Sequence, residues 1–332
     1  MWFRQFTVRR GARSTAIDTR SGIRLTALLL SAVLPSAALG QDAAPSTPPA
    51  LPVALDTIVL TPDRSTRMTV PVLLDGKGPY SFVVDTGAER TSVSNELAAT
   101  LALRSAGNAR LHSVTGVTPV GLYHIGTLDM DRHRATDLRA PGMAGAHLGG
   151  PGLIGVDTLK QQRVTMDFRK RTMTIAPSKT RDAAARGDDI IVKARSRAGR
   201  LVIMDATLDG ARVAVILDTG SQTSLGNEAL KRKLFAQRRK RPSAQIELRD
   251  VIGGRMTATY TTTHALKIAD FQLNALPIAL ADAHIFTELG FADKPAMLLG
   301  MDALALFERV TIDFRRRTAR FLRPHETEIA SW

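Results

Sequence analysis

The 332-residue sequence contains no cysteine, so it can form no disulfide bond and has no thiol nucleophile. Aromatic residues make up only 5% of the chain, and they do not alternate with basic residues in a pattern that would suggest base stacking. Nucleic acid is therefore not an expected partner. No Gly-x-Ser-x-Gly element is present to mark a serine hydrolase. The apolar run Leu25–Leu34 is only marginally long enough to cross a bilayer.

That apolar run is instead typical of a targeting segment. It follows several arginines and precedes Ala37-Ala38-Leu39-Gly40, which predicts a Sec-type signal peptide over residues 1–40, cleaved near Gly40. The predicted location is periplasmic or secreted, with an uncleaved membrane anchor as the alternative. A lipid anchor is excluded because no cysteine follows the run. Residues 41–54 are rich in alanine, proline, serine and threonine and are predicted to form a flexible tether.

The chain is basic, with a formal net charge of +14. Residues 1–40 hold six arginines and one aspartate, so 39 basic and 30 acidic residues remain after cleavage. The densest basic stretch, Lys231–Arg241, is predicted to continue a helix that starts near Asn227. A solvated helix face explains such a stretch better than a specific function does. The alternative is a functional role, either attraction of an acidic substrate or peripheral contact with an anionic membrane surface.

The tripeptide Asp-Thr-Gly occurs twice, as Asp85-Thr86-Gly87 and Asp218-Thr219-Gly220. Each copy follows an apolar, β-branched run that predicts a buried strand, so each aspartate is expected where a strand ends. The glycine is expected to give the backbone freedom for a sharp turn that exposes the aspartate. One triplet alone would indicate an ordinary turn, whereas two copies with matching flanks indicate the carboxylate pair of an aspartic peptidase.

The duplication extends beyond the triplets. Upstream, Pro71–Gly76 and Asp205–Gly210 both predict a strand that ends in an Asp-Gly hairpin turn. Downstream, two blocks recur in the same order in both halves: Leu153-Ile154-Gly155-Val156-Asp157 with Leu298-Leu299-Gly300-Met301-Asp302, and Val164–Thr172 with Val310–Thr318. The sequence therefore predicts two homologous lobes of roughly 120 residues each.

These features resemble the retropepsin-like aspartyl proteases of bacteria, which are relatives of the retroviral and pepsin-type enzymes. The resemblance covers residues 55–322. In that family the Asp-Thr-Gly loop follows two hydrophobic residues, and a later hydrophobic-hydrophobic-Gly segment packs beneath it in a ψ-shaped loop. The resemblance implies that this segment comprises Leu153, Ile154, Gly155, Leu298, Leu299 and Gly300. Two complete halves in one chain imply a pepsin-style fused enzyme that is active as a monomer.

The chemistry of such a family needs two aspartates, here Asp85 and Asp218. Two adjacent carboxylates cannot both ionise cheaply, so the pair shares one proton. The ionised group takes a proton from the attacking water, and the protonated group hydrogen-bonds the scissile carbonyl oxygen. No covalent intermediate, cofactor or metal is required.

The resemblance also implies roles for the residues around the pair. Thr86 and Thr219 are expected to cross-brace the two loops, and Gly87 and Gly220 to let backbone amides approach the carboxylates. The residues that follow the triplets differ and are expected to tune the acidity of the pair: Ala88 in the retroviral style and Ser221 in the pepsin style. Together they predict a mildly acidic to near-neutral pH optimum.

A peptidase of this type also needs a cover over its substrate. Two glycine-containing hairpins are candidates, His112–Val117 around Thr115 and Gly116, and Asp250–Arg255 around Gly253 and Gly254. The first lacks the tyrosine that pepsin has at the flap tip, because Tyr123 lies further along. Two ordinary hairpins are the alternative interpretation.

Other motif matches fail on context. Gly150–Gly155 fits G-x-G-x-x-G but contains proline and is explained by the recurring hydrophobic-Gly segment. Asp129, Asp131 and His133 alternate along the chain, but no second ligand cluster accompanies them, which favours an exposed polar strand over a metal site. His325-Glu-Thr-Glu-Ile329 lacks the second histidine of a zinc-protease helix.

The predicted fold is mainly β: a bilobal, pepsin-like double β-barrel with pseudo-twofold symmetry and the active-site cleft between the lobes. The predicted boundaries are 55–176 for the first lobe, 177–189 for the linker, 190–323 for the second lobe and 324–332 for a tail. Short helices are expected at Asn95–Leu103 and Asn227–Phe235. The predicted function is aspartic endopeptidase acting on polypeptides, and the alternative is a catalytically silent periplasmic protein that binds peptides or other partners on the same fold.

Overall fold

The structure, a computed structural model, describes residues 57–59, 68–130, 133–180, 189–236 and 242–323. All of them lie in one compact unit, Val53–Trp332, and a second unit, Met1–Pro52, lies outside them. The predicted signal peptide, tether and tail therefore fall outside the described residues. No helix within the described ranges is both long and apolar enough to cross a bilayer.

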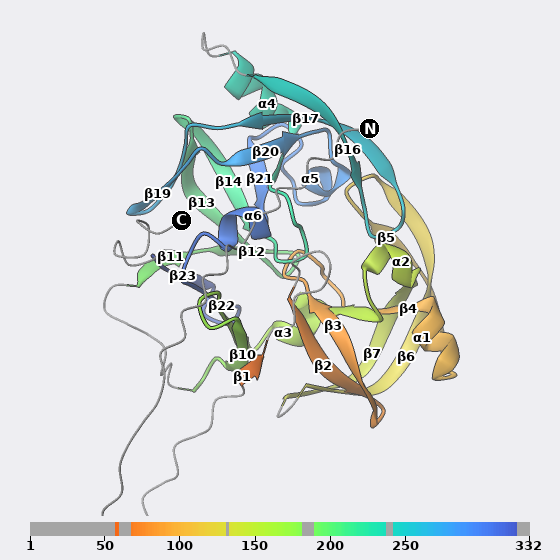
Figure 1. Cartoon of the computed structure of the whole chain (residues 1–332). Helices are drawn as coiled ribbons and strands as arrows, with labels where there is room; N and C mark the ends of the chain where they lie inside the picture. Colours follow the sequence, from red (N-terminus) through yellow and green to blue (C-terminus); the bar gives the residue numbers. More distant parts are fainter. Residues whose placement is uncertain (1–56, 60–67, 131–132, 181–188, 237–241, 324–332) are drawn as a thin grey trace, which may run out of the picture. The chain divides into compact units, whose positions relative to one another are not determined.

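Strands hold 55% of the described residues and helices 13%, so the predicted mainly β class is confirmed. The strands form three sheets. Figure 1 labels most of the strands by their order along the chain. One sheet belongs to each half of the chain, and strands from both halves build the third.

The sheet of the first lobe closes on itself. Its order is β2-β3-β8-β4-β7-β6, and β6 pairs back with β2, so six strands complete a ring, while β5 lies outside on β6. The strands are β2 (Thr69–Leu74), β3 (Lys77–Val84), β4 (Ser92–Ser94), β5 (Ser105–His112), β6 (Val117–Met130), β7 (His133–Met143) and β8 (Gly152–Ile154). The helices are α1 (Asn95–Thr100), α2 (Gly145–Leu148) and α3 (Val156–Leu159).

The sheet of the second lobe has the order β16-β17-β20-β15-β21-β14-β13-β18-β19, with β12 paired to β13. Its strands are β12 (Arg195–Arg197), β13 (Arg200–Leu208), β14 (Ala211–Leu217), β15 (Leu225–Gly226), β16 (Ser243–Arg249), β17 (Arg255–Thr262), β18 (Ala265–Ile268), β19 (Phe271–Asn274), β20 (Pro277–Leu280) and β21 (Ala296–Leu299). Its helices are α4 (Glu228–Phe235), α5 (His284–Glu288) and α6 (Met301–Leu304).

The third sheet joins the two lobes. It runs β1 (Thr57–Val59), β10 (Thr172–Pro177), β9 (Gln162–Asp167), β22 (Arg309–Asp313), β23 (Thr318–Leu322) and β11 (Ile190–Lys193), all antiparallel. At its centre Thr165 lies opposite Thr311, and the two hydroxyls are 3.2 Å apart. These threonines are equivalent in the recurring blocks, so the pseudo-twofold axis passes between them.

The predicted linker is packed at both of its ends. Pro177 is the last residue of β10, and the Asp189 carboxylate pairs with the Arg309 guanidinium at 3.0 Å, with both side chains buried. Residues 181–188 lie outside the described ranges. The predicted lobe boundaries stay a prediction.

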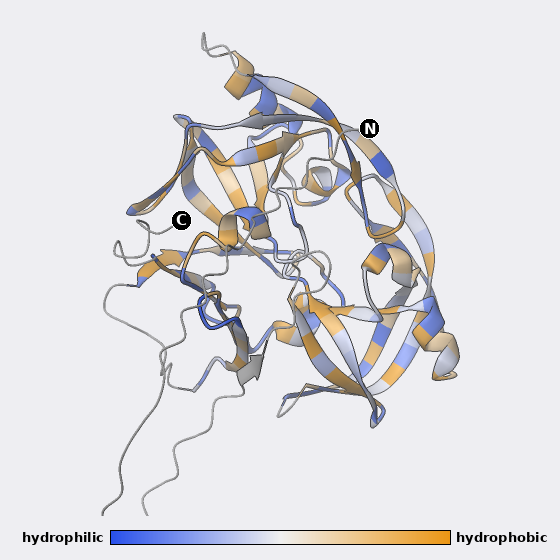
Figure 2. Cartoon of the chain, viewed as in Figure 1, coloured by the Kyte–Doolittle hydropathy of each residue, from blue (hydrophilic) through white to orange (hydrophobic). Residues whose placement is uncertain are grey.

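In each lobe, a hairpin with an Asp-Gly turn precedes the Asp-Thr-Gly loop, and its sequence pattern explains its structure. Along β2, Val70, Val72 and Leu74 are buried while the residues between them are not, which is the period-2 pattern of a sheet with one face on the core. Figure 2 shows the same alternation of hydrophobic and hydrophilic bands along the strands of the first lobe. The two predicted Asp-Gly turns have positive φ at both residues, 48° and 76° at Asp75-Gly76 and 50° and 86° at Asp209-Gly210, as a type I′ hairpin turn requires.

The two expected helices are present and slightly shorter than predicted. The Ser94 hydroxyl caps α1 by accepting from the Leu97 amide, and the helix ends at Thr100. The Asn227 side chain caps α4 in the same way through the Leu230 amide. Because α4 ends at Phe235, it does not extend through the whole basic stretch, of which residues 237–241 lie outside the described ranges.

Candidate active site

Both Asp-Thr-Gly loops begin where a central strand ends. Asp85 follows β3 directly, and its amide donates to the Ile154 carbonyl at 2.9 Å. Asp218 follows β14, and its amide donates to the Leu299 carbonyl at 3.1 Å. Strands β3 and β8 are parallel, as are β14 and β21, so in each lobe the hydrophobic-hydrophobic-Gly segment runs beside the strand that carries the aspartate.

A second pair of aspartates supports these segments, and sequence reasoning assigned it no role. In the first lobe, the Asp157 carboxylate accepts from the amide and the hydroxyl of Thr91, both at 2.8 Å. In the second lobe, Asp302 accepts from the amide and the hydroxyl of Ser224, at 2.9 and 2.7 Å. The same hydroxyls accept from the amides of Gly155 and Gly300. The signal was available, because Asp157 and Asp302 are the last residues of the recurring five-residue block.

Thr86 and Thr219 tie the two loops together. The amide of each donates to the hydroxyl of the other, both at 3.1 Å. Each hydroxyl then donates across the lobes, Thr86 to the Leu217 carbonyl at 2.9 Å and Thr219 to the Val84 carbonyl at 2.7 Å. Both threonines are buried, so the loops are held in one relative position by bonds shielded from water.

The two glycines are needed for a reason other than the expected backbone freedom. Neither Gly87 nor Gly220 has a positive φ, so conformational freedom does not explain them. A Cβ on Gly87 would instead lie 2.5 Å from the Asp218 carboxylate, and a Cβ on Gly220 would collide with the Asp85 carboxylate. Each loop thus leaves room for the aspartate of the other lobe, which places the two carboxylates on either side of the lobe junction.

Backbone amides hold both carboxylates. Asp85 Oδ1 accepts from the amides of Gly87 and Ala88 at 2.8 and 2.9 Å. Asp218 Oδ1 accepts from the amides of Gly220 and Ser221 at 3.0 and 3.1 Å. The Ser221 hydroxyl donates to the Thr223 carbonyl at 2.7 Å. Ala88 and Ser221 therefore contact the carboxylates through equivalent backbone groups.

The two aspartates differ in burial, and the charge of Asp85 affects the pKa of Asp218. Asp218 is 8% exposed, against partial exposure for Asp85. Burial, and then the charge of Asp85, raise the pKa of Asp218 from its ordinary 3.8 to about 7, against the lowering effect of the Gly220 and Ser221 amides and of Arg200. The expectation that the tight turn exposes the aspartate is therefore wrong for Asp218. Its carboxyl is suited to hold a proton at mildly acidic pH.

Arg200 is a further residue at this junction that sequence reasoning missed. It is the first residue of β13, it is only 7% exposed, and its Nε donates to the Gly87 carbonyl at 2.5 Å. Its positive charge lowers the pKa of Asp218. One side chain of the second lobe therefore fixes the first active-site loop and adjusts the acidity of the second.

The two candidate flap hairpins meet each other. The β5–β6 hairpin carries Thr115 and Gly116 at its tip, and the β16–β17 hairpin carries Gly253 and Gly254. The Thr115 hydroxyl donates to the Asp250 carboxylate, and a Cβ on Gly254 would collide with that hydroxyl. Burial acts to raise the pKa of Asp250, but hydrogen bonds from the Thr115 and Ser113 side chains and from the Ile252 and Gly254 amides together outweigh it and hold the pKa below its ordinary value.

Each hairpin tip also packs on the opposite lobe. Val114, from the first lobe, lies against a hydrophobic cluster of the second lobe that includes Phe286. Val251 and Ile252, from the second lobe, lie against a cluster of the first lobe that includes Leu153. The exchange is reciprocal, so the two hairpins act as a pair. Tyr123 lies within β6 and contacts Asn95, away from the tip.

The rejected motifs have structural roles. Asp129 forms an ion pair with Arg134, and His133 contacts the Thr158 carbonyl at 3.1 Å, while Asp131 lies outside the described residues. Within Gly150–Gly155, residues Gly152–Ile154 form β8. His325–Ile329 also lies outside the described residues.

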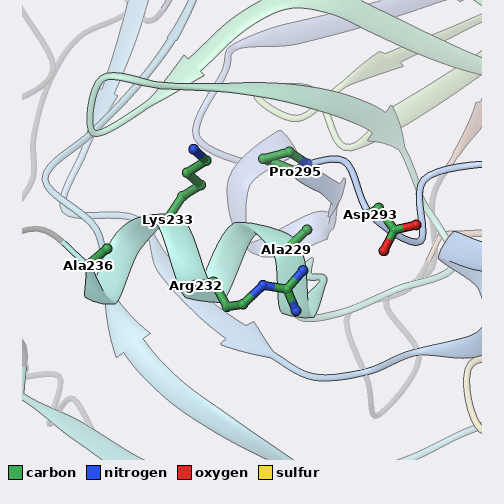
Figure 3. Close-up of a pocket in the computed structure, with 6 residues that line it drawn as sticks. All are labelled: Ala229, Arg232, Lys233, Ala236, Asp293 and Pro295. Atoms are coloured by element: carbon green, nitrogen blue, oxygen red, sulfur yellow. The ribbon is translucent and has the colours of Figure 1, made fainter.

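A surface hollow of about 330 Å³ lies beside α4 (Figure 3). It is lined by Ala229, Arg232, Lys233, Ala236, Asp293 and Pro295. Arg232 and Lys233, which belong to the predicted basic stretch, are exposed beside it. A solvated face and a membrane contact both require this exposure, so the interpretation of the stretch stays a prediction.

Comparisons with known proteins match both halves of the chain. A family described as gag-polyprotein putative aspartyl protease matches residues 70–161, and a family described as aspartyl protease matches residues 204–303. The crystal structure of aspartic proteinase from Irpex lacteus is similar over 84% of this chain and 100% of that chain, with a TM-score of 0.52 and 12% identity. At this identity the similarity shows the fold, and the predicted bilobal double-barrel architecture is confirmed. No curated protein matches the chain in sequence.

Proposed function

We propose that this chain, which belongs to the retropepsin- and pepsin-like aspartyl protease family with both lobes in one polypeptide, is an aspartic endopeptidase. One observation carries the proposal: the Asp85 carboxylate packs against Gly220 and the Asp218 carboxylate against Gly87, so each lies against the glycine of the opposite loop. The charge of Asp85 raises the pKa of Asp218, as expected of a carboxyl pair that shares one proton.

The environment of the pair suggests a division of roles. Asp218, buried and with a pKa of about 7, is the group that keeps the proton and hydrogen-bonds the scissile carbonyl oxygen. Asp85, more exposed and held by two backbone amides, is the ionised group that takes a proton from the attacking water. As the water adds, Asp218 passes its proton to the carbonyl oxygen, so a neutral tetrahedral diol forms while Asp85 holds the proton taken from water. Asp85 then protonates the leaving nitrogen, the C–N bond breaks, and Asp218 takes back a proton from a diol hydroxyl, which returns the pair to its shared-proton state.

The surroundings support a polypeptide substrate bound in extended form. Extended peptides bind well where a hairpin can add main-chain hydrogen bonds, and here two hairpin tips meet at the lobe junction. They must separate to admit a substrate and close again over it. No cofactor takes part in the proposed reaction. We further propose that the enzyme is a monomer of the periplasm or exterior, that nucleic acid is not a partner, and that a peripheral membrane contact would involve the basic helix α4.

The test is cleavage of a diverse peptide library by residues 41–332 between about pH 3 and about pH 8, with and without a transition-state inhibitor of aspartic proteases. We expect cleavage that the inhibitor blocks and that Asp85→Asn and Asp218→Asn each reduce by at least about 10³-fold. Asp205→Asn, at an exposed position of β13, is the matched control and should retain full activity.

The alternative function, a silent peptide-binding protein on the same fold, predicts the opposite result. No cleavage at any pH, with all variants folded by circular dichroism, would refute the endopeptidase proposal. Saturable binding of library peptides by the folded wild-type protein under those conditions would favour the alternative.

A further inference from the structure

Three side chains that can bind metal converge where the first hairpin touches the second lobe. His112 is the last residue of β5, and His284 and Glu288 lie one turn apart on α5. His112 Nδ1 lies 3.0 Å from His284 Nε2 and 3.0 Å from Glu288 Oε1, and His284 Nε2 lies 3.2 Å from the same oxygen. The two imidazole rings are stacked, with centroids 5.2 Å apart and planes 18° from parallel.

Hydrogen bonds alone suit this triangle of atoms poorly. If both imidazole nitrogens carry a proton and donate to Glu288, the two N–H groups face each other at 3.0 Å. If only one nitrogen carries a proton, its N–H can serve the other nitrogen and the carboxylate only as a shared donor, and the lone pair of the unprotonated nitrogen still faces the carboxylate oxygen. With the Glu288 carboxyl ionised, no arrangement of protons gives all three contacts a donor and an acceptor, whereas a cation at the centre of the triangle would accept a lone pair from each atom.

The separations fit a transition-metal ion. Zinc binds imidazole nitrogen at about 2.0–2.1 Å and carboxylate oxygen at about 2.0–2.2 Å in tetrahedral geometry, so neighbouring ligand atoms lie about 3.3 Å apart. The observed 3.0, 3.0 and 3.2 Å are within a few tenths of an ångström of that value. Two histidines and one carboxylate complete a three-ligand zinc set, and partial exposure of all three side chains leaves the fourth position open to water.

We propose that His112, His284 and Glu288 form a binding site for a divalent ion of the zinc class that fastens the first hairpin to the second lobe. The backbone already seats the hairpin there, because the His284 amide donates to the Val114 carbonyl at 2.9 Å. One ligand comes from the first lobe and two from the second, so the bound ion bridges them. Since the hairpin must lift to admit a substrate, the ion acts as a latch that slows peptide cleavage; this consequence rests on the proposed peptidase function.

Binding is tested first, and without reference to activity. The chain from residue 41 is treated with a chelator, dialysed and titrated with zinc chloride in a calorimeter at about pH 7.5, where imidazole is mostly neutral. We expect one ion per chain, and absorption bands of tetrahedral cobalt when Co²⁺ replaces zinc. His112→Ala and His284→Ala should each weaken binding by about 100-fold, and Glu288→Gln by about 10-fold or more. His264→Ala, at an exposed histidine of the same lobe, should bind like the wild type.

Absence of one-to-one binding, or equal affinity in His284→Ala and His264→Ala, would overturn the site. The latch is tested separately, by measuring peptide cleavage with and without zinc. Zinc should lower the rate severalfold in the wild type and in His264→Ala, and leave the rate of His284→Ala unchanged. If one zinc ion binds per chain but the rate of peptide cleavage does not change, the proposed slowing of cleavage is wrong and the proposed metal site stands. If no form of the chain cleaves peptides, the endopeptidase proposal fails while the binding result stands.

Discussion

Thr86 and Thr219 exchange amide-to-hydroxyl hydrogen bonds across the two lobes, at 3.1 Å in both directions. Their hydroxyls also reach the carbonyls that precede the opposite aspartates, at Leu217 and Val84. The loops that carry Asp85 and Asp218 are thus fixed to each other before a substrate binds. Preorganisation of this kind reduces the rearrangement that catalysis would otherwise require.

Removing either hydroxyl should destabilise the whole chain. Thr219→Val keeps the side-chain shape but leaves the buried Thr86 amide and the Val84 carbonyl without partners, at a cost of about 2–4 kcal/mol in the free energy of unfolding. Thr219→Ser keeps the hydroxyl and loses one methyl group, at a cost of about 1 kcal/mol. Urea denaturation of both variants makes the comparison. Equal losses would mean that the hydrogen bonds contribute little.

The raised pKa of Asp218 should make the stability of the fold depend on pH. Between about pH 4 and about pH 7 the folded chain holds a proton on Asp218 that the unfolded chain has lost, so the free energy of unfolding falls as the pH rises through this range. Asp218→Asn carries no charge and avoids this loss. We expect the free energy of unfolding of this variant to exceed that of the wild type by about 2–4 kcal/mol above pH 7 and to equal it near pH 4.

Urea denaturation at about pH 4 and about pH 8 measures this difference, with the exposed Asp205→Asn as the control. The control should follow the wild type at both pH values. A variant Asp218→Asn that is no more stable than the wild type at the higher pH would refute the raised pKa.

Arg200 should affect the pH profile of peptide cleavage. Its charge lowers the pKa of Asp218, so Arg200→Met should raise that pKa and move the alkaline fall in kcat/KM upward by about half a pH unit. The same variant loses the bond to the Gly87 carbonyl, which should lower the maximal rate by about tenfold. Arg200→Lys keeps the positive charge, so the alkaline fall in its kcat/KM should occur at the same pH as in the wild type. If kcat/KM falls at the same alkaline pH in Arg200→Met and Arg200→Lys, Arg200 has no electrostatic role.

Locking the hairpin tips together should block turnover. Because the chain has no cysteine, Thr115→Cys with Asp250→Cys creates two thiols with no competitor. A short thiol-specific cross-linker should join them and reduce peptide cleavage by at least about 100-fold, while each single variant treated with the same reagent keeps its activity. Full cleavage by the cross-linked protein, verified by mass spectrometry, would mean that substrates enter without the hairpins parting.

Local and repeated patterns account for what the sequence could predict. The Asp-Thr-Gly loops, the segments at Leu153 and Leu298 and the Asp-Gly turns each occur twice with matching neighbours, and both copies form equivalent structures. For the two glycines, the expected backbone freedom is wrong, while the expected approach of their amides to the carboxylates is present. The steric reason was missed because the carboxylate that excludes a Cβ at Gly87 lies in the other half of the chain.

Contacts without a repeated signal could not be predicted. The Arg200–Gly87, Thr115–Asp250 and His112–His284 contacts join residues 113, 135 and 172 positions apart. Each occurs once, and nothing in the local sequence around either partner marks the other. They depend on how the lobes come together, which composition and periodicity do not encode.

The axis between Thr165 and Thr311 has a consequence for how a substrate lies on the protein. About this axis the backbone repeats, but the side chains do not: β5 ends in His112 where β16 ends in Arg249. A peptide has an amino and a carboxyl direction, and a strictly symmetric pair of identical subunits presents the same surface to both. Because the two halves here are joined in one chain and differ, reversing a bound peptide would change its neighbours, and a single polarity of binding can be favoured.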